Sequence, residues 1–98
     1  MATYQVTLGS DAQGYPTASP DPVSISQSAG DKLQYMSAGP TFTVTFANSP
    51  FTINTGRVTP SMAVILTLKS GVSPGTFKYS IVNNDNGLNT DPDVIVRP

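Results

Sequence analysis

The chain has 98 residues, of which 38% are hydrophobic and only 11% are charged, and its formal net charge is −1. It contains no Cys and no His, which excludes disulfides, thiol nucleophiles, imidazole bases and metal sites built on either side chain. Nucleic-acid binding needs several cations that converge on phosphates. The five cations are instead scattered along the chain, at Lys32, Arg57, Lys69, Lys78 and Arg97. We therefore expect no nucleic-acid partner.

The length fits one domain over residues 1–98. The longest apolar run, residues 62–66, is far short of the roughly 20 residues that cross a bilayer, so we expect no transmembrane segment. The first residues lack a basic segment followed by an apolar core, so no secretory signal is expected. A cytoplasmic protein and a mature exported domain both fit, because a chain without Cys suits either compartment.

In the first half of the chain, apolar and polar residues alternate in short runs between turn residues, which indicates β-strands. The first predicted strand covers residues 3–8, and a Gly-, Pro-, Ser- and Asp-rich loop follows over residues 9–22. Two short strands are predicted next, one around Val23 and Ile25 and one around Leu33 and Tyr35. The clearest alternation follows, over residues 41–46.

The second half of the chain continues this pattern. Residues 48–60 are irregular, and strands are predicted over residues 62–68, 76–81 and 94–96. A turn at residues 70–75 and a polar loop at residues 83–93 separate these strands. No segment carries a helical apolar stripe. The sequence therefore predicts an all-β fold, a two-sheet Greek-key sandwich of seven to eight strands.

Two stretches resemble the cupredoxins, the plastocyanin-like sandwiches. Residues 29–35 (AGDKLQY) and 42–46 (FTVTF) are similar to that family's Gly-Asp-x-Val-x-Trp and His-x-Val-x-Phe strands. Residues 74–81 (PGTFKYSI) resemble its Pro-Gly-Thr-Tyr-x-Tyr-x-Cys strand, and residues 93–96 resemble its closing Gly-x-Ile-x-Val strand. The resemblance extends over most of the chain from residue 23 onward and implies a cupredoxin-like sandwich.

Copper-binding cupredoxins hold their metal with two His, one Cys and usually a weak Met. The resemblance places Phe42 at the first His, Ile81 at the Cys and Asn84 at the second His, with Leu88 or Asn89 near the Met. Such a site needs thiolate and imidazole donors. The resemblance therefore implies the fold without its electron transfer, and we expect no cofactor and no metal. We expect Phe42, Ile81 and Leu88 to extend the core instead.

The polar loop over residues 83–93 is the densest group of side-chain oxygens, which raises calcium as an alternative. An EF-hand frame with Gly87 sixth would put Val82 first and Asp93 twelfth. Val82 offers no ligand atom. The preferred interpretation is an Asn86-Gly87 turn, because these residue types accept positive φ and cap their own backbone.

Acid–base catalysis would need a convergent pair of carboxylates. Asp91 and Asp93 lie close in sequence, as do Asp11 and Asp21, but the chain has no Glu or His that would complete a site. We expect the protein not to be an enzyme.

Most aromatic residues alternate within predicted strands and are assigned to the core. Tyr15, between Gly14 and Pro16, and Phe51, after Pro50, are the two that could be exposed. The alternative for each is that it anchors its loop to the core.

Two classes of function remain. The first is a non-catalytic structural or protein-interaction module, which self-associates or binds an unknown protein through Ser- and Thr-rich strand faces of low charge. The alternative is a carbohydrate or small-ligand binding module. Its candidate residues are Tyr15, Phe51, Asn84, Asp85 and Asn86.

Overall fold

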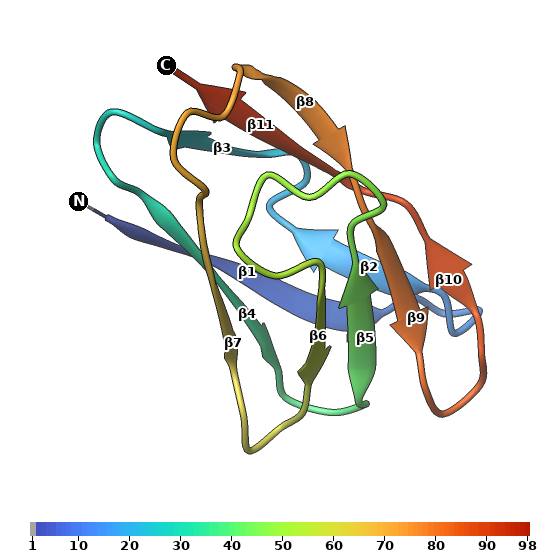
Figure 1. Ribbon diagram of the computed structural model, residues 1–98. Coiled ribbons are helices and arrows are strands. Elements are labelled where there is room, and N and C mark those ends of the chain that lie inside the picture. The colour runs from blue at the N-terminus through green and yellow to red at the C-terminus, as the bar shows by residue number, and fades with distance from the viewer. Residues whose placement is uncertain (1) are drawn as a thin grey trace.

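Residues 2–98 are described by a computed structural model, and they form β-strands without any helix (Figure 1). Four strands make the first sheet, in the order β2-β1-β4-β7. They are β1 (Thr3–Ser10), β2 (Pro16–Ser19), β4 (Lys32–Ser37) and β7 (Val64–Thr67). β1 and β4 run parallel, and the other neighbours are antiparallel. This sheet is one layer of the molecule.

Two smaller sheets make the facing layer, with the orders β3-β11-β8 and β10-β9-β5-β6. Their strands are β3 (Val23–Ser26), β5 (Phe42–Thr45), β6 (Thr55–Val58), β8 (Gly75–Lys78), β9 (Ser80–Asn83), β10 (Asn89–Thr90) and β11 (Asp93–Arg97). Only Tyr79 separates β8 from β9, and only Asp91 and Pro92 separate β10 from β11. The two sheets therefore continue into one another (Figure 1).

β2 and β3 are likewise two halves of one extended segment, which passes from one sheet to another at residues 20–22. With the pairs β8–β9 and β10–β11 also counted as single segments, the eleven strands of the described residues form eight longer segments. The chain crosses repeatedly between the layers, as a Greek-key sandwich requires. The predicted all-β, two-sheet fold is confirmed. Among the described residues no helix is long and apolar enough to cross a membrane.

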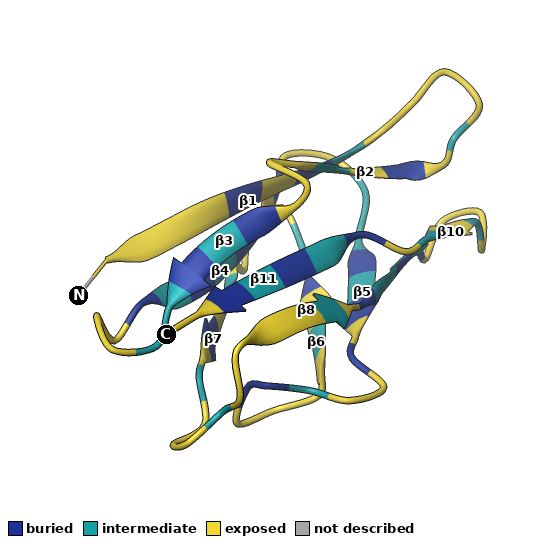
Figure 2. Ribbon diagram, turned by 90° about the horizontal axis from the view of Figure 1, so that it is seen from above, coloured by how far each residue is buried: buried dark blue, intermediate teal, exposed yellow. Residues whose placement is uncertain are grey.

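The core lies between the two layers and is built from every second residue of the strands. β11 shows the pattern well, because buried and half-buried positions alternate along it between β3 and β8 (Figure 2). Aromatic rings fill the middle. Tyr35 meets Tyr79 edge-on with ring centroids 5.5 Å apart, and Phe46 stacks on Tyr79 at 4.9 Å. Edge-on and stacked pairs of this kind stabilise a core beyond their buried area.

Three strands lie where the sequence predicted loops. β2 falls inside residues 9–22, β6 inside residues 48–60 and β10 inside residues 83–93. Each is too short or too polar to show alternation. β2 turns only Pro16 and Ala18 inward, so it is held as a strand mainly by its antiparallel pairing with β1. Gly56 of β6 carries no side chain, so only Val58 marks the inward face.

Candidate functional site

The positions that the cupredoxin resemblance assigns to copper ligands lie in β5, β9 and the turn after β9. Phe42 and Ile81 are both 0% exposed, and neither side chain carries a metal-donor atom. In the ladder between β5 and β9, Phe42 pairs with Asn83, and Val44 pairs with Ile81. The predicted extension of the core by Phe42 and Ile81 is confirmed.

Leu88, the third residue of that predicted cluster, lies elsewhere. It is half-buried and outside the main core. A Cβ at Gly14 would lie 3.6 Å from the Leu88 side chain, so Leu88 packs against the β1–β2 turn. The reason is that the hydrogen bond from Asn86 to the Gly14 carbonyl holds the turn after β9 against the β1–β2 turn, so Leu88 meets that turn and not the core between the layers.

Asn83 is a buried polar residue that the sequence interpretation missed. It is 3% exposed, and its side-chain oxygen accepts a hydrogen bond from the Asp85 amide at 2.9 Å. Its side-chain nitrogen donates to Ser10 Oγ at 3.4 Å. The alternation Tyr79, Ile81, Asn83 could have revealed it, because a polar residue in phase with a buried strand face needs internal partners.

Tyr15 and the polar turn after β9 lie side by side, although more than 65 residues separate them in the sequence. Asn86 Nδ2 donates to the Gly14 carbonyl at 3.0 Å, and Thr90 Oγ1 donates to the Pro16 carbonyl at 2.9 Å. We call Tyr15, Asn84, Asp85 and Asn86 the loop-end surface. Tyr15 is 43% exposed there, and Asn84, Asp85 and Asn86 are also exposed.

The two amides of this surface are largely engaged by the protein itself. Asn84 Oδ1 accepts from Thr43 Oγ1 at 2.9 Å. Asn86 uses its nitrogen for Gly14, and its Oδ1 accepts from the Leu88 amide at 3.0 Å. The predicted Asn-Gly turn is present, with Gly87 at φ 76°. The Tyr15 ring and the Asp85 carboxylate are therefore the groups best placed to meet a ligand.

Phe51, the fifth candidate residue, is 0% exposed and belongs to the core. Its ring meets Phe46 edge-on at 5.2 Å, and its backbone forms an isolated bridge with Leu68. It offers no exposed face to a ligand, so the idea of an exposed Phe51 is wrong. The alternative interpretation, that Phe51 anchors its loop to the core, is confirmed. Burying the ring removes a large apolar surface from water, which offsets part of the entropy lost when the loop is ordered.

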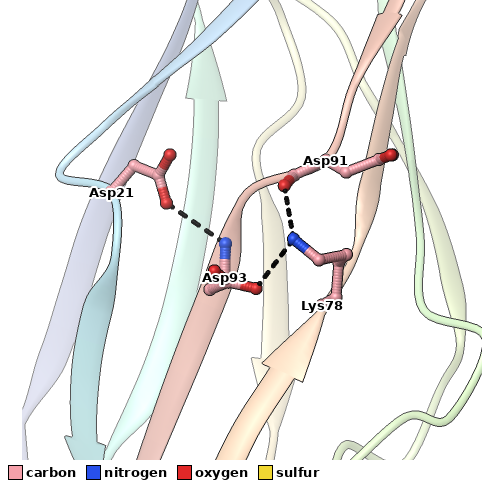
Figure 3. A network of polar contacts seen from close by, with 4 residues as sticks. All are labelled: Asp21, Lys78, Asp91 and Asp93. Carbon is pink, nitrogen blue, oxygen red and sulfur yellow. Dashed lines mark hydrogen bonds and ion pairs between the residues drawn. The ribbon is translucent and has the colours of Figure 1, made fainter.

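The carboxylates that lie close in sequence do not converge into a pair. Asp93 pairs with Lys78 at 3.3 Å, while Lys78 Nζ also donates to the Asp91 carbonyl at 3.1 Å (Figure 3). The Asp91 carboxylate points away from this contact (Figure 3). Asp21 accepts from the Asp93 amide at 3.1 Å, and Asp11 caps its own turn by accepting from the Gln13 and Tyr15 amides. Each contact stabilises the backbone.

Potential metal ligands do not gather either. Within residues 2–98 no three carboxylates come close enough together to hold a metal ion. A groove of about 730 Å³ lies near the C-terminus, at the far end from the loop-end surface, and Gln27, Lys69 and Pro98 are among its lining residues.

Two buried tyrosines, Tyr35 and Tyr79, have pKa values that are raised above the ordinary value of a tyrosine. Burial, the dominant cause, raises the pKa of Tyr79 to about 12 and raises that of Tyr35 further. Neither hydroxyl has a hydrogen-bond partner among the described residues. Both groups are neutral under ordinary conditions, so they are core side chains and not acid–base groups.

Sequence comparison matches the chain to no known protein family and to no curated protein. Comparison of folds finds a similar structure, a pseudoazurin from Sinorhizobium meliloti. The TM-score is 0.60 at 17% sequence identity, and the alignment covers 100% of this chain and 76% of the pseudoazurin. At this identity the similarity establishes the fold alone. The fold is cupredoxin-like.

Proposed function

We propose that this chain is a non-catalytic interaction module on a cupredoxin-like scaffold without copper, and that its partner is a second copy of itself. The observation that carries the proposal is the outer face of the first sheet, which is broad, almost uncharged and partly apolar. The residues at the family's metal positions do not fit copper, and this outer face suits contact with a protein.

The residues at the former ligand positions do not fit a copper ion. Phe42 and Ile81 fill the space with carbon, and the oxygen of Asn84 already accepts a hydrogen bond from Thr43. Thiolate and imidazole donors are what such a site requires, and the chain contains neither. Electron transfer, which the family resemblance would otherwise suggest, is therefore not proposed.

The outer face consists of the side chains of the first sheet that alternate with the core positions. Register places Met36 beside Thr7, and Gln34 between Gln5 and Ile65. Met36 is 37% exposed and Ile65 55%. The outer face comprises Thr3, Gln5, Thr7, Thr17, Ser19, Lys32, Gln34, Met36, Ile65 and Thr67. Depletion of charge around an exposed Met is typical of the centre of a protein interface.

Charge favours a second copy as the occupant. Lys32 is the single charge among those ten residues, whereas the outward positions of the opposite layer include Arg57, Lys78, Asp93 and Arg97. An uncharged face can meet itself without like-charge repulsion. Lys32 lies at one end of β4, so a two-fold arrangement in which the β4 strands of the two copies run antiparallel would hold the two lysines at opposite ends of the interface.

The size of the outer face predicts weak association. At about 3.3 Å per residue and about 4.8 Å between strands, the 22 residues of the four strands cover roughly 350 Å². Stable complexes bury about 800 Å² on each partner. A dimer that forms only at high protein concentration is therefore expected.

Sedimentation velocity over a range of concentrations tests this proposal. The mass should rise above 10.3 kDa at high concentration and fall on dilution. Ile65→Lys should keep the protein monomeric, while Ile53→Lys should not, because Ile53 is similarly exposed but lies outside the outer face. A monomer at every concentration would exclude self-association. Blue absorbance on copper titration would contradict the copper-free scaffold.

A second candidate function is supported by the approach of Tyr15 to the turn after β9. An exposed ring and an exposed carboxylate carried by neighbouring turns suit stacking and hydrogen bonding of a sugar or another small polar ligand. Titration with a panel of monosaccharides and disaccharides, followed by NMR, would test it. Shifts should be lost in Tyr15→Ala and Asp85→Ala and kept in Tyr4→Ala, which removes an equally exposed ring elsewhere. A wild-type spectrum that no sugar perturbs would remove this candidate.

A further inference from the structure

The contact between the two turns of the loop-end surface depends on a chemically unstable dipeptide, Asn86-Gly87. Asn86 is exposed, and Gly87 has no side chain to shield its backbone nitrogen. In an Asn-Gly sequence that nitrogen can attack the preceding carboxamide, because nothing bulky blocks the approach. The same carboxamide supplies the hydrogen bond that joins the turn to Gly14.

We propose that Asn86 is a self-modification site whose conversion breaks the hydrogen bond between the turn after β9 and the β1–β2 turn and so loosens the β1–β2 turn. The Gly87 nitrogen loses its proton and bonds to Cγ of Asn86. The bond from Cγ to Nδ2 breaks, and the nitrogen leaves with the proton as ammonia. The product is a five-membered succinimide. Water then opens either carbonyl–nitrogen bond of the ring and gives aspartate or isoaspartate at position 86. No redox partner is required.

The folded turn holds this reaction back through three hydrogen bonds. The Gly87 amide, the attacking group, donates to the Asn83 carbonyl at 2.7 Å. The two polar atoms of the carboxamide are held by the Leu88 amide and the Gly14 carbonyl. The side chain must leave these contacts before Cγ can meet the Gly87 nitrogen. Modification therefore proceeds from a locally opened turn, and its rate measures that opening.

The product cannot restore the contact. A carboxylate at position 86 is only an acceptor, and so is the Gly14 carbonyl that it would face. Two acceptors at hydrogen-bond distance repel, and the new negative charge lies beside Asp85. The β1–β2 turn then loses this hydrogen bond, while the packing of Leu88 and the bond from Thr90 to Pro16 remain, so the turn around Tyr15 loosens. Isoaspartate would in addition lengthen the backbone and displace the bond to Leu88.

Timed incubation at mildly alkaline pH, folded and in urea, tests the proposal, with peptide mapping of the segment between Lys78 and Arg97. Asn83, Asn84 and Asn89 lie in the same peptide and serve as internal controls, because none precedes Gly. Asn86 should be the main site of conversion in urea. In the folded chain it should react at least about tenfold more slowly, which corresponds to an opening free energy of about 1.4 kcal/mol.

Two variants test the consequence. Asn86→Asp should increase hydrogen exchange of the amides at residues 13–15, while Asn84→Asp, an equal charge change that leaves the bond to Gly14 intact, should not. Equal rates of conversion in the folded and unfolded chains would overturn the protective role of the turn. Unchanged exchange in Asn86→Asp would overturn the loosening of the β1–β2 turn.

Discussion

The side chain of Asn86 and the backbone of Gly14, 72 residues apart in the sequence, are joined by a hydrogen bond of 3.0 Å. The approach is so close that a Cβ at Gly14 would lie 2.8 Å from Asn86 Nδ2. Gly14 also has φ 88°, in the left-handed region that L side chains rarely adopt. Gly14 is thus required twice, for its backbone conformation and for the space that it leaves.

Gly14→Ala should therefore destabilise the protein more than an ordinary left-handed glycine would. Left-handed strain costs roughly 1–2 kcal/mol, and displacing Asn86 should add about 1 kcal/mol for the lost hydrogen bond. Gly71→Ala is the matched control, because Gly71 has φ 70° and nothing within 4 Å of its added Cβ. Urea unfolding measures both. Equal losses of unfolding free energy would show that the Asn86 contact contributes nothing.

Gly56→Ala tests the packing between β6 and β7. Its Cβ would lie 2.9 Å from Cγ1 of Val64, so the two layers must separate locally. Overpacking of this kind costs about 1–3 kcal/mol. Val64→Ala should relieve most of that cost in the double variant, measured as a coupling free energy. Gly75→Ala, in β8 with nothing within 4 Å, should be close to neutral. A neutral Gly56→Ala would contradict the close packing.

Removal of the buried hydroxyl of Tyr35 should not destabilise the protein. Tyr35 Oη forms no hydrogen bond of ordinary geometry among residues 2–98, and the nearby Tyr79 hydroxyl, which influences its pKa, compensates its desolvation poorly. Phenylalanine keeps the edge-on contact with Tyr79. Tyr35→Phe should leave the free energy of unfolding unchanged or raise it by up to about 1 kcal/mol. Thermal unfolding measures the change, with Tyr4→Phe at an exposed position as control. A loss of more than about 1 kcal/mol would show that the hydroxyl is satisfied in solution.

The raised tyrosine pKa values predict a loss of stability at alkaline pH. The pKa of Tyr79 is about 12 in the folded chain, against an ordinary value of 10.0. Above pH 10 the unfolded chain releases the proton and the folded chain retains it, so the unfolding free energy should fall as pH rises from 10 toward 12. At about 1.4 kcal/mol per pKa unit, Tyr79 alone should account for roughly 2–3 kcal/mol. Tyr35 acts in the same direction.

Urea titrations at several pH values between 8 and 12 measure this dependence. Tyr79→Phe should make the decline shallower, because phenylalanine does not titrate, and the decline that remains should come from Tyr35. A wild-type protein whose unfolding free energy stays constant over this range would contradict the burial of the two phenols.

The cupredoxin-like fold was predictable where the buried positions alternate over a full strand. Phe42, Val44 and Phe46 illustrate this, since a strand with one face in the core needs an apolar residue at every second position. β2 was not predictable, because Pro16 and Ala18 give only a weak apolar alternation. Its extended conformation depends on antiparallel pairing with β1. Pairing depends on a neighbour that local sequence does not reveal.

The candidate site was likewise predictable only in part from the sequence. Residue types alone excluded thiol and imidazole chemistry and identified the Asn86-Gly87 turn. Only the tertiary structure decided that Phe51 is buried, that Asn83 is a polar core residue, and that Tyr15 lies beside the turn after β9. The physical reason is that composition fixes which donors and acceptors exist. Which of them meet is decided by long-range strand register, and contacts between residues more than 65 positions apart leave no local periodic signal.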